Sequence, residues 1–254
     1  MWWMLTGLLV GFVGALVGAG GGFLLMPVLL LAYRLPPPDA AAVSLVAVTA
    51  ASLSGTITYA RQGQVDFHAG LTLALFAIPG SMLGARLAGH APLGAFSWLF
   101  GLLLAAMGLW MAVGRGSRRR PGSGWVPVRH RPAAAGANLV APLHACMVVV
   151  GGLASLFGIG GGPLVVPLLA LGGGMEAHRA AATSQLIILL SSLAGVAGYA
   201  LGGRVSWGPA AALAVGAMLG APLGAGAGLR LDPRRLLQIL GLCLLLVGMR
   251  IMWR

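Results

Sequence analysis

Two glycine clusters interrupt the apolar sequence with backbone groups that could bind an anion. The first lies in GAGGGFLLMP, Gly18 to Pro27, and the second in GIGGGPLVVP, Gly158 to Pro167. Three adjacent glycines break a helix, and the chain after each cluster reads as a new helix whose first N–H groups lack partners. Such a helix start attracts negative charge. We therefore expect a substrate site formed by Gly20, Gly21, Gly22, Gly160, Gly161 and Gly162.

Uncharged polar side chains follow each cluster and could complete this site. The segment AVSLVAVTAASLSG carries Ser44, and AATSQLIILLSSLAG carries Ser184 and Gln185. Polar residues inside membrane segments are functional hypotheses by default, although such a serine often bonds a backbone carbonyl. We expect Ser44, Ser184 and Gln185 to bind substrate, with Gln185 setting a preference because Leu45 stands at its counterpart. The same segments also hold Thr49, Ser52, Ser54, Thr183, Ser191 and Ser192.

Helix packing is the alternative explanation for glycines in apolar segments. Small residues four apart allow two helix backbones to approach closely. This is the better interpretation of a downstream run at Gly216, Gly220, Gly224 and Gly228. The triple glycines exceed what packing requires, so we favour a binding site for them.

Other chemistries find little support in the sequence. The four acidic residues, Asp39, Asp66, Glu176 and Asp232, stand at the ends of apolar segments, which leaves no mid-membrane carboxylate for a cation site. His144 reads as a packed or interfacial histidine. A dinucleotide-binding fingerprint would need glycine where the chain has Phe23 and Pro163. We expect no catalytic residue, no metal ligand and no cofactor, and hence a protein that is not an enzyme.

The elements that position these residues are membrane segments. The chain is 59% hydrophobic and 8% charged, with a mean hydropathy of +0.95. Apolar stretches long enough to approach or cross a bilayer, roughly 20 residues each, occupy 2–33, 40–60, 67–89, 92–114, 138–174, 177–202, 206–229 and 232–253. The first and fifth are oversized and contain the glycine clusters, so we predict an all-α polytopic membrane protein in which both are broken.

The two halves of the chain are similar to each other. Shifting the sequence by the spacing between Gly20 and Gly160 aligns the halves without a gap, with about a third of the pairs identical, as in repeat-built transporters. We expect a transmembrane repeat at 1–114, a linker at 115–137 and a second transmembrane repeat at 138–254. Each repeat then comprises a broken segment and three helices.

The orientation of the repeats depends on the broken segments. If each crosses the membrane once, the repeats are parallel; if each turns back, they are inverted and both termini lie outside. The arms of the first break, Leu5–Val17 and Phe23–Tyr33, are both shorter than the roughly 20 residues that span a bilayer. We therefore favour inverted repeats.

The positive charge concentrates in the linker. The formal net charge is +12, and the densest basic run is RGSRRRPGSGWVPVRHRP at 115–132. A Pro- and Gly-rich basic link between apolar blocks is what the positive-inside rule places in the cytoplasm. We expect this loop to be solvated or to contact anionic lipid, and we expect no nucleic-acid partner.

The duplicated motifs resemble those of the TauE/SafE family of sulfite and organosulfonate exporters. These motifs are the GxGGGxxxxP boxes, the AVS and ATS tripeptides that follow them, and YARQGQV and YALGGRV. The resemblance implies a multi-pass permease of the bacterial inner membrane for small sulfur-containing anions such as sulfite or sulfoacetate. It also implies that the two boxes, with Ser44, Ser184 and Gln185, surround the substrate.

The sequence thus predicts a secondary transporter that exports a small sulfur-containing anion by alternating access at a midplane site. A permease for another small anion and a membrane scaffold subunit are the alternatives, since glycines also permit tight packing. The expected partners are the anion and membrane lipid, and a homodimer is plausible.

Overall fold

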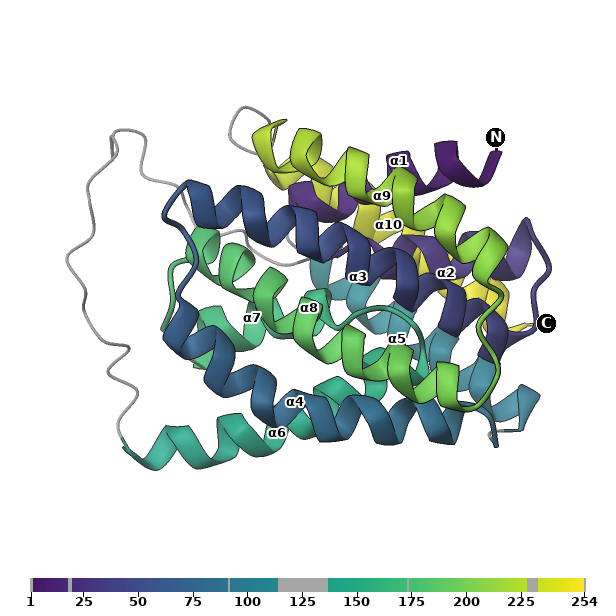
Figure 1. The fold of residues 1–254 in the computed structure, drawn as a ribbon, viewed down its shortest axis with the longest axis horizontal. Coiled ribbons are helices and arrows are strands. Elements are labelled where there is room, and N and C mark those ends of the chain that lie inside the picture. Colours follow the sequence, from purple (N-terminus) through teal and green to yellow (C-terminus); the bar gives the residue numbers. More distant parts are fainter. Residues whose placement is uncertain are drawn as a thin grey trace.

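The computed structural model describes residues 2–17, 20–90, 92–113, 137–172, 174–227 and 233–253, and the elements within these ranges are helices (Figure 1). The predicted linker therefore lies outside the described residues, except for Ala137. The elements are α1 (Trp2–Val17), α2 (Gly22–Leu31), α3 (Pro37–Arg61), α4 (Phe67–Ala88), α5 (Leu93–Val113), α6 (Ala137–Leu156), α7 (Gly162–Pro167), the π-helical turn η1 (Leu168–Gly172), α8 (Ala177–Leu201), α9 (Trp207–Ala227) and α10 (Pro233–Met252).

Within the part of the chain that the structure describes, four helices are long and apolar enough to cross a membrane: α3, α4, α8 and α9. The structure also holds shorter apolar helices, among them Trp2–Leu16 and Gly22–Leu31. Large apolar side chains such as Leu75, Leu201 and Leu223 are exposed on the surface, as expected where lipid rather than water surrounds the protein. The all-helical prediction is thus confirmed for the described residues, and their apolar helices are consistent with a membrane protein.

Acidic residues mark helix starts, as their places in the sequence predict. Asp39 lies in the first turn of α3, and Glu176 directly precedes α8. Asp66 caps α4, because its side chain accepts a hydrogen bond of 3.1 Å from the Ala69 amide. Asp232 lies outside the described residues.

The first helix pair turns back on itself. Trp3, near the start of α1, stacks on Tyr33, just beyond the end of α2, with ring centroids 3.7 Å apart. The hydroxyls of Thr6 and Tyr33 lie 3.1 Å apart. Because residues at the two outer ends of the pair touch, the chain reverses between Val17 and Gly22.

The second pair reverses in the same way. A Cβ placed on Gly172, at the end of η1, would lie 3.6 Å from Leu143 Cδ1, near the start of α6. A Cβ on Gly161, at the turn, would lie 3.0 Å from Ala154 Cβ near the end of α6. α6 and the α7–η1 segment therefore also form a hairpin.

Helices α3 and α8 form the centre of the molecule and run antiparallel. Gly55 of α3 faces Gln185 of α8, while Leu45 of α3 faces Gly195 of α8. Around this pair, α9 packs on α3 and α4 packs on α8, and α1 and α6 lie outside α9 and α4 respectively. α5 packs against α10. Figure 1 shows the two chain ends at the same end of the long axis, while α6 begins at the opposite end.

Corresponding residues of the two halves make corresponding hydrogen bonds. The Tyr59 hydroxyl donates to the Ala15 carbonyl over 3.0 Å, and the Tyr199 hydroxyl donates to the Ser155 carbonyl over 2.9 Å. Both members of the second bond lie 140 residues after their counterparts in the first. Each bond ties the third helix of its half to the end of the first.

Glycines on α9 let α1 approach closely, as the spacing of small residues predicts. A Cβ on Gly216, Gly220 or Gly224 would lie 1.9–2.1 Å from a carbonyl oxygen of α1, on Met4, Leu8 or Phe12 respectively. No side chain fits at these positions, so this seam depends on glycine. Gly228 lies outside the described residues.

Candidate functional site

The two glycine breaks meet in the interior, beside the same pair of side chains. A Cβ on Gly20 would lie 3.4 Å from Val48 Cγ1 of α3 and from Ile188 Cγ2 of α8. A Cβ on Gly160 would lie 2.4 and 3.3 Å from the same two atoms. Val48 and Ile188 are buried, and so are both glycines. The breaks therefore border one point on the α3–α8 seam.

The glycines at each break adopt a backbone conformation that other residues avoid. The φ angles are 72° at Gly20, 81° at Gly21, 73° at Gly160 and 78° at Gly161. Gly21 and Gly161 are the N-cap residues of α2 and α7. The left-handed region costs other residues roughly 1–3 kcal/mol. The turn at each break therefore explains why glycine stands at these positions.

Gly22 and Gly162 begin the helices that follow, and both are buried. A Cβ on Gly22 would lie 2.7 Å from the Ile159 carbonyl oxygen, so the two breaks contact each other through backbone. The Gly21 carbonyl accepts from the Leu24 and Leu25 amides. The amides of Gly22 and Phe23 precede these bonds and have no partner within the helix.

Ser44 and Ser184 are buried but donate to backbone. The Ser44 hydroxyl donates to the Gly158 carbonyl over 2.7 Å, which ties α3 to the second break. The Ser184 hydroxyl donates to the Ala181 carbonyl over 2.7 Å within α8. In this structure both serines therefore support the glycine breaks and the central helices.

Gln185 belongs to a buried set of polar atoms that have no hydrogen-bond partner among the described residues. Its side chain is 1% exposed, and both its amide oxygen and its amide nitrogen lack a partner. The same holds for the hydroxyls of Ser52 and Thr56, which are 0% and 7% exposed. An unsatisfied buried polar group costs about 1–3 kcal/mol, so three together require an explanation. We refer to Ser52, Thr56 and Gln185 as the polar cluster.

The polar cluster reaches the first glycine break through Ser52. A Cβ on Gly20 would lie 3.3 Å from Ser52 Oγ, and a Cβ on Gly55 would lie 3.2 Å from Gln185 Oε1. Ser52, Gly55 and Thr56 share one face of α3, because residues three and four apart are neighbours on a helix. The Gln185 amide therefore contacts the face of α3 that carries both hydroxyls.

The positions equivalent to the polar cluster at the repeat spacing carry no matching cluster. Leu45 and Val196 stand at the positions equivalent to Gln185 and Thr56. Ser192, the counterpart of Ser52, accepts a 2.9 Å hydrogen bond from Thr49. Nearby, Ser81 bonds to the Ser155 hydroxyl and the Ser191 carbonyl. The hydroxyl that stands at an equivalent position, that of Ser192, is thus bonded within the protein.

Sequence reasoning overlooked Thr56. Thr56 stands just beyond the polar segment that ends at Gly55, and a threonine near the end of a helix is more often a surface residue. Its place four residues after Ser52 is the signal that indicates a shared face. His144, in contrast, lies away from the cluster, half-buried against the ring of Phe76 with centroids 4.2 Å apart.

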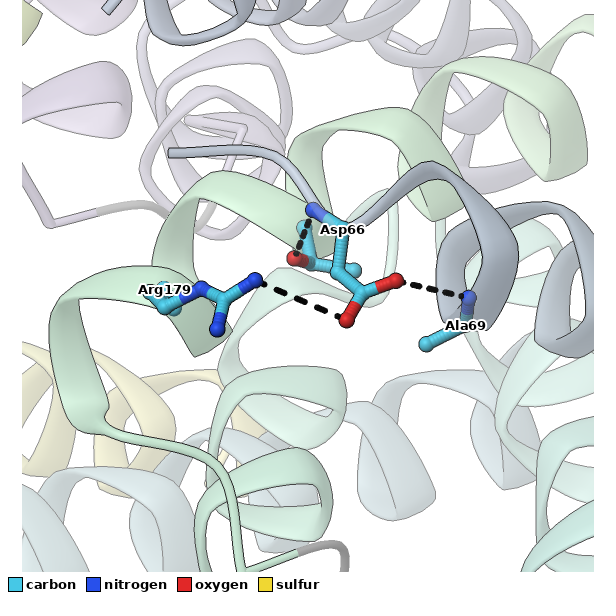
Figure 2. Close-up of polar contacts among 4 residues, drawn as sticks. Asp66, Ala69 and Arg179 are labelled. Atoms are coloured by element: carbon cyan, nitrogen blue, oxygen red, sulfur yellow. Dashed lines mark hydrogen bonds and ion pairs between the residues drawn. The ribbon is translucent and has the colours of Figure 1, made fainter. Parts of the chain in front are cut away.

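Asp66, in the turn that precedes α4, contacts the start of α8 (Figure 2). Its carboxylate lies 3.6 Å from an Arg179 guanidinium nitrogen, and its amide donates to Thr183 Oγ1 over 3.0 Å. Arg179 and Thr183 lie in the first two turns of α8, just before Gln185. The turn between α3 and α4 therefore covers the α8 end nearest the polar cluster.

Comparisons with known proteins agree with a membrane protein. The family model described as "Sulfite exporter TauE/SafE" matches residues 3–251. The chain is 31% identical to the probable membrane transporter protein YunE of Bacillus subtilis, over 98% of this chain and 96% of the relative. It is 30% identical to a probable membrane transporter protein of Xylella fastidiosa, over 98% and 93%. A probable membrane transporter protein of Methanocaldococcus jannaschii is 28% identical, over 77% and 70%.

No solved structure matches the chain. Family, relatives and apolar helices together identify a multi-pass membrane protein.

Proposed function

The chain belongs to the sulfite exporter TauE/SafE family, and on this premise we propose that it is a secondary transporter for a small sulfur-containing anion. The substrate is sulfite or an organosulfonate such as sulfoacetate, exported across the bacterial inner membrane. That the chain is a membrane transporter follows from the family and the relatives. The substrate and the direction are the proposal.

One observation carries the proposal: buried polar atoms without protein partners lie beside a break in a membrane hairpin. Backbone without regular structure at membrane depth is tolerated where it is packed in protein or lines a cavity. In this account Gly20, Gly21 and Gly22 present backbone amides to the anion, and Gln185 and the two hydroxyls of the polar cluster supply side-chain donors. Gly160, Gly161 and Gly162 form the opposite wall, with Ser44 and Ser184 fixing the helices around it.

Magnitudes indicate why several donors are needed. Desolvating a small ion costs on the order of 20 kcal/mol in the idealised limit. A helix start contributes up to about 2 kcal/mol, and each hydrogen bond to a charged group contributes roughly 1.5–3 kcal/mol. A partly hydrated anion held by α2 and the polar cluster therefore fits better than a fully dehydrated one held by the helix alone.

The arrangement of the helices supports inverted repeats. Both hairpins turn back, α3 and α8 run antiparallel, and the tyrosine hydrogen bonds recur at the repeat spacing. Two equivalent hairpins around one central point suit alternating access. With the basic linker in the cytoplasm, both termini lie outside; tags on the termini that react only from the cytoplasm would contradict this topology.

Ligand-dependent stabilisation separates a transporter from a membrane scaffold. Detergent-solubilised protein is heated with increasing sulfite or sulfoacetate, and with acetate as the control. A ligand at 100 times its dissociation constant stabilises the folded state by about 2.7 kcal/mol, so we expect a saturable rise in melting temperature with at least one sulfur anion. If no anion shifts the melting temperature, the scaffold alternative is favoured.

A further inference from the structure

We propose that Gln185 makes the site select anions that carry their own hydrogen-bond donor, an O–H or N–H group. Hydrogensulfite and hydroxyl-bearing sulfonates belong to this class, whereas a sulfonate with only acceptor oxygens, such as the sulfoacetate dianion, does not. The inference rests on the proposed function and narrows its substrate.

The argument starts from what each polar atom can do. A serine or threonine hydroxyl can donate or accept, so Ser52 and Thr56 adapt to an anion oxygen. The Gln185 amide presents donors at its nitrogen and only acceptor capacity at its oxygen. Both ends are buried without a partner, and exchanging the oxygen and nitrogen positions still leaves one acceptor to satisfy.

An anion that offers only oxygen lone pairs cannot satisfy the Gln185 carbonyl. Two acceptors facing each other repel, and the carbonyl stays unpaired in a buried place. A substrate hydroxyl donates to the carbonyl while its anionic oxygens accept from the amide nitrogen and the hydroxyls. Sites built to bond a substrate hydroxyl discriminate strongly against analogues that lack it.

The equivalent positions of the repeat show that this selectivity is not duplicated. At the repeat spacing, Leu45 replaces Gln185 and Val196 replaces Thr56, and the remaining hydroxyl, that of Ser192, is bonded to Thr49. No carbonyl side chain therefore stands at the equivalent position beside Gly195. The donor requirement applies to the cluster at the first break.

Competition in proteoliposomes tests the inference. Exchange of radiolabelled sulfite is measured with 2-hydroxyethanesulfonate or ethanesulfonate as competitor, two anions of equal charge that differ by one hydroxyl. We expect the hydroxyl-bearing anion to compete about tenfold better, the factor that one additional satisfied hydrogen bond supplies. Equal competition by the two sulfonates would overturn the inference while leaving the transporter intact; absence of sulfite exchange would overturn the proposed function itself.

Substitutions test whether Gln185 provides the preference for the hydroxyl-bearing anion. Gln185→Leu, which introduces the residue of the other half, should bring the ratio of the two competitors close to one, and Gln185→Met serves if the leucine variant does not fold. Ser81→Ala is the matched control, because Ser81 is equally buried but bonded within the protein. A Gln185→Leu protein that keeps the tenfold preference would show that another group provides it.

Discussion

At the residue scale, substitutions at the glycines test folding, whereas substitutions in the polar cluster test binding. A side chain at Gly21 would lie 2.6 Å from the Val10 carbonyl oxygen and would have to adopt a φ of 81°. Replacing Gly21 therefore disturbs folding, even where the amide contributes to binding. Gln185→Leu keeps the approximate volume and removes only the polar atoms, so it reports on binding.

Asp66 combines a helix cap with an ion pair, and two substitutions separate them. Asp66→Ala loses both, and we expect the free energy of unfolding to fall by about 1 kcal/mol from the cap and up to about 1 kcal/mol from the ion pair. The pair contributes little because its side chains are 22% and 31% exposed. Asp66→Asn keeps the cap and should lose less than about 1 kcal/mol.

Thermal unfolding of the two Asp66 variants in detergent measures the difference. The sequence places Asp66 at a helix start correctly, but its contact with Arg179 and Thr183 depends on how the α3–α4 turn lies over α8. An asparagine variant as unstable as the alanine variant would contradict a separate capping role.

At the element scale, the apolar pattern predicts helix ends closely because water-exposed turns interrupt it. The stretches 67–89 and 206–229 become α4 (Phe67–Ala88) and α9 (Trp207–Ala227). Within the oversized stretch 138–174, the pattern could not separate α6, α7 and η1, since all three are apolar. Only the glycines at 160–162 indicated that the stretch is broken between α6 and α7.

Two glycines of α9 make a matched test of its packing on α1. Gly220→Ala places a Cβ 2.1 Å from the Leu8 carbonyl oxygen, while a Cβ on Gly226 meets nothing within 4 Å. We expect Gly220→Ala to lower the free energy of unfolding by about 1–3 kcal/mol, because helices must separate. Gly226→Ala should change it by less than about 0.5 kcal/mol. Equal melting temperatures for the two variants would contradict this account of the seam.

At the scale of the whole molecule, the repeat spacing predicts which segments correspond but not how they meet. Ser44, Ser184 and the glycine boxes could be chosen because both halves contain them. The polar cluster breaks that correspondence, and it depends on the register of α3 against α8, which brings Gly55 beside Gln185. Side-chain contacts across antiparallel helices do not follow from either sequence segment alone.

Counterflow of radiolabelled sulfite in proteoliposomes tests the central claim most directly, since it requires the protein to carry the anion across a bilayer. Chloride, acetate and a monovalent cation are the controls. The account predicts saturable exchange of sulfite, and not of the controls, by purified wild-type protein. Folded protein that exchanges no sulfur anion, or that exchanges acetate and chloride equally well, would contradict it.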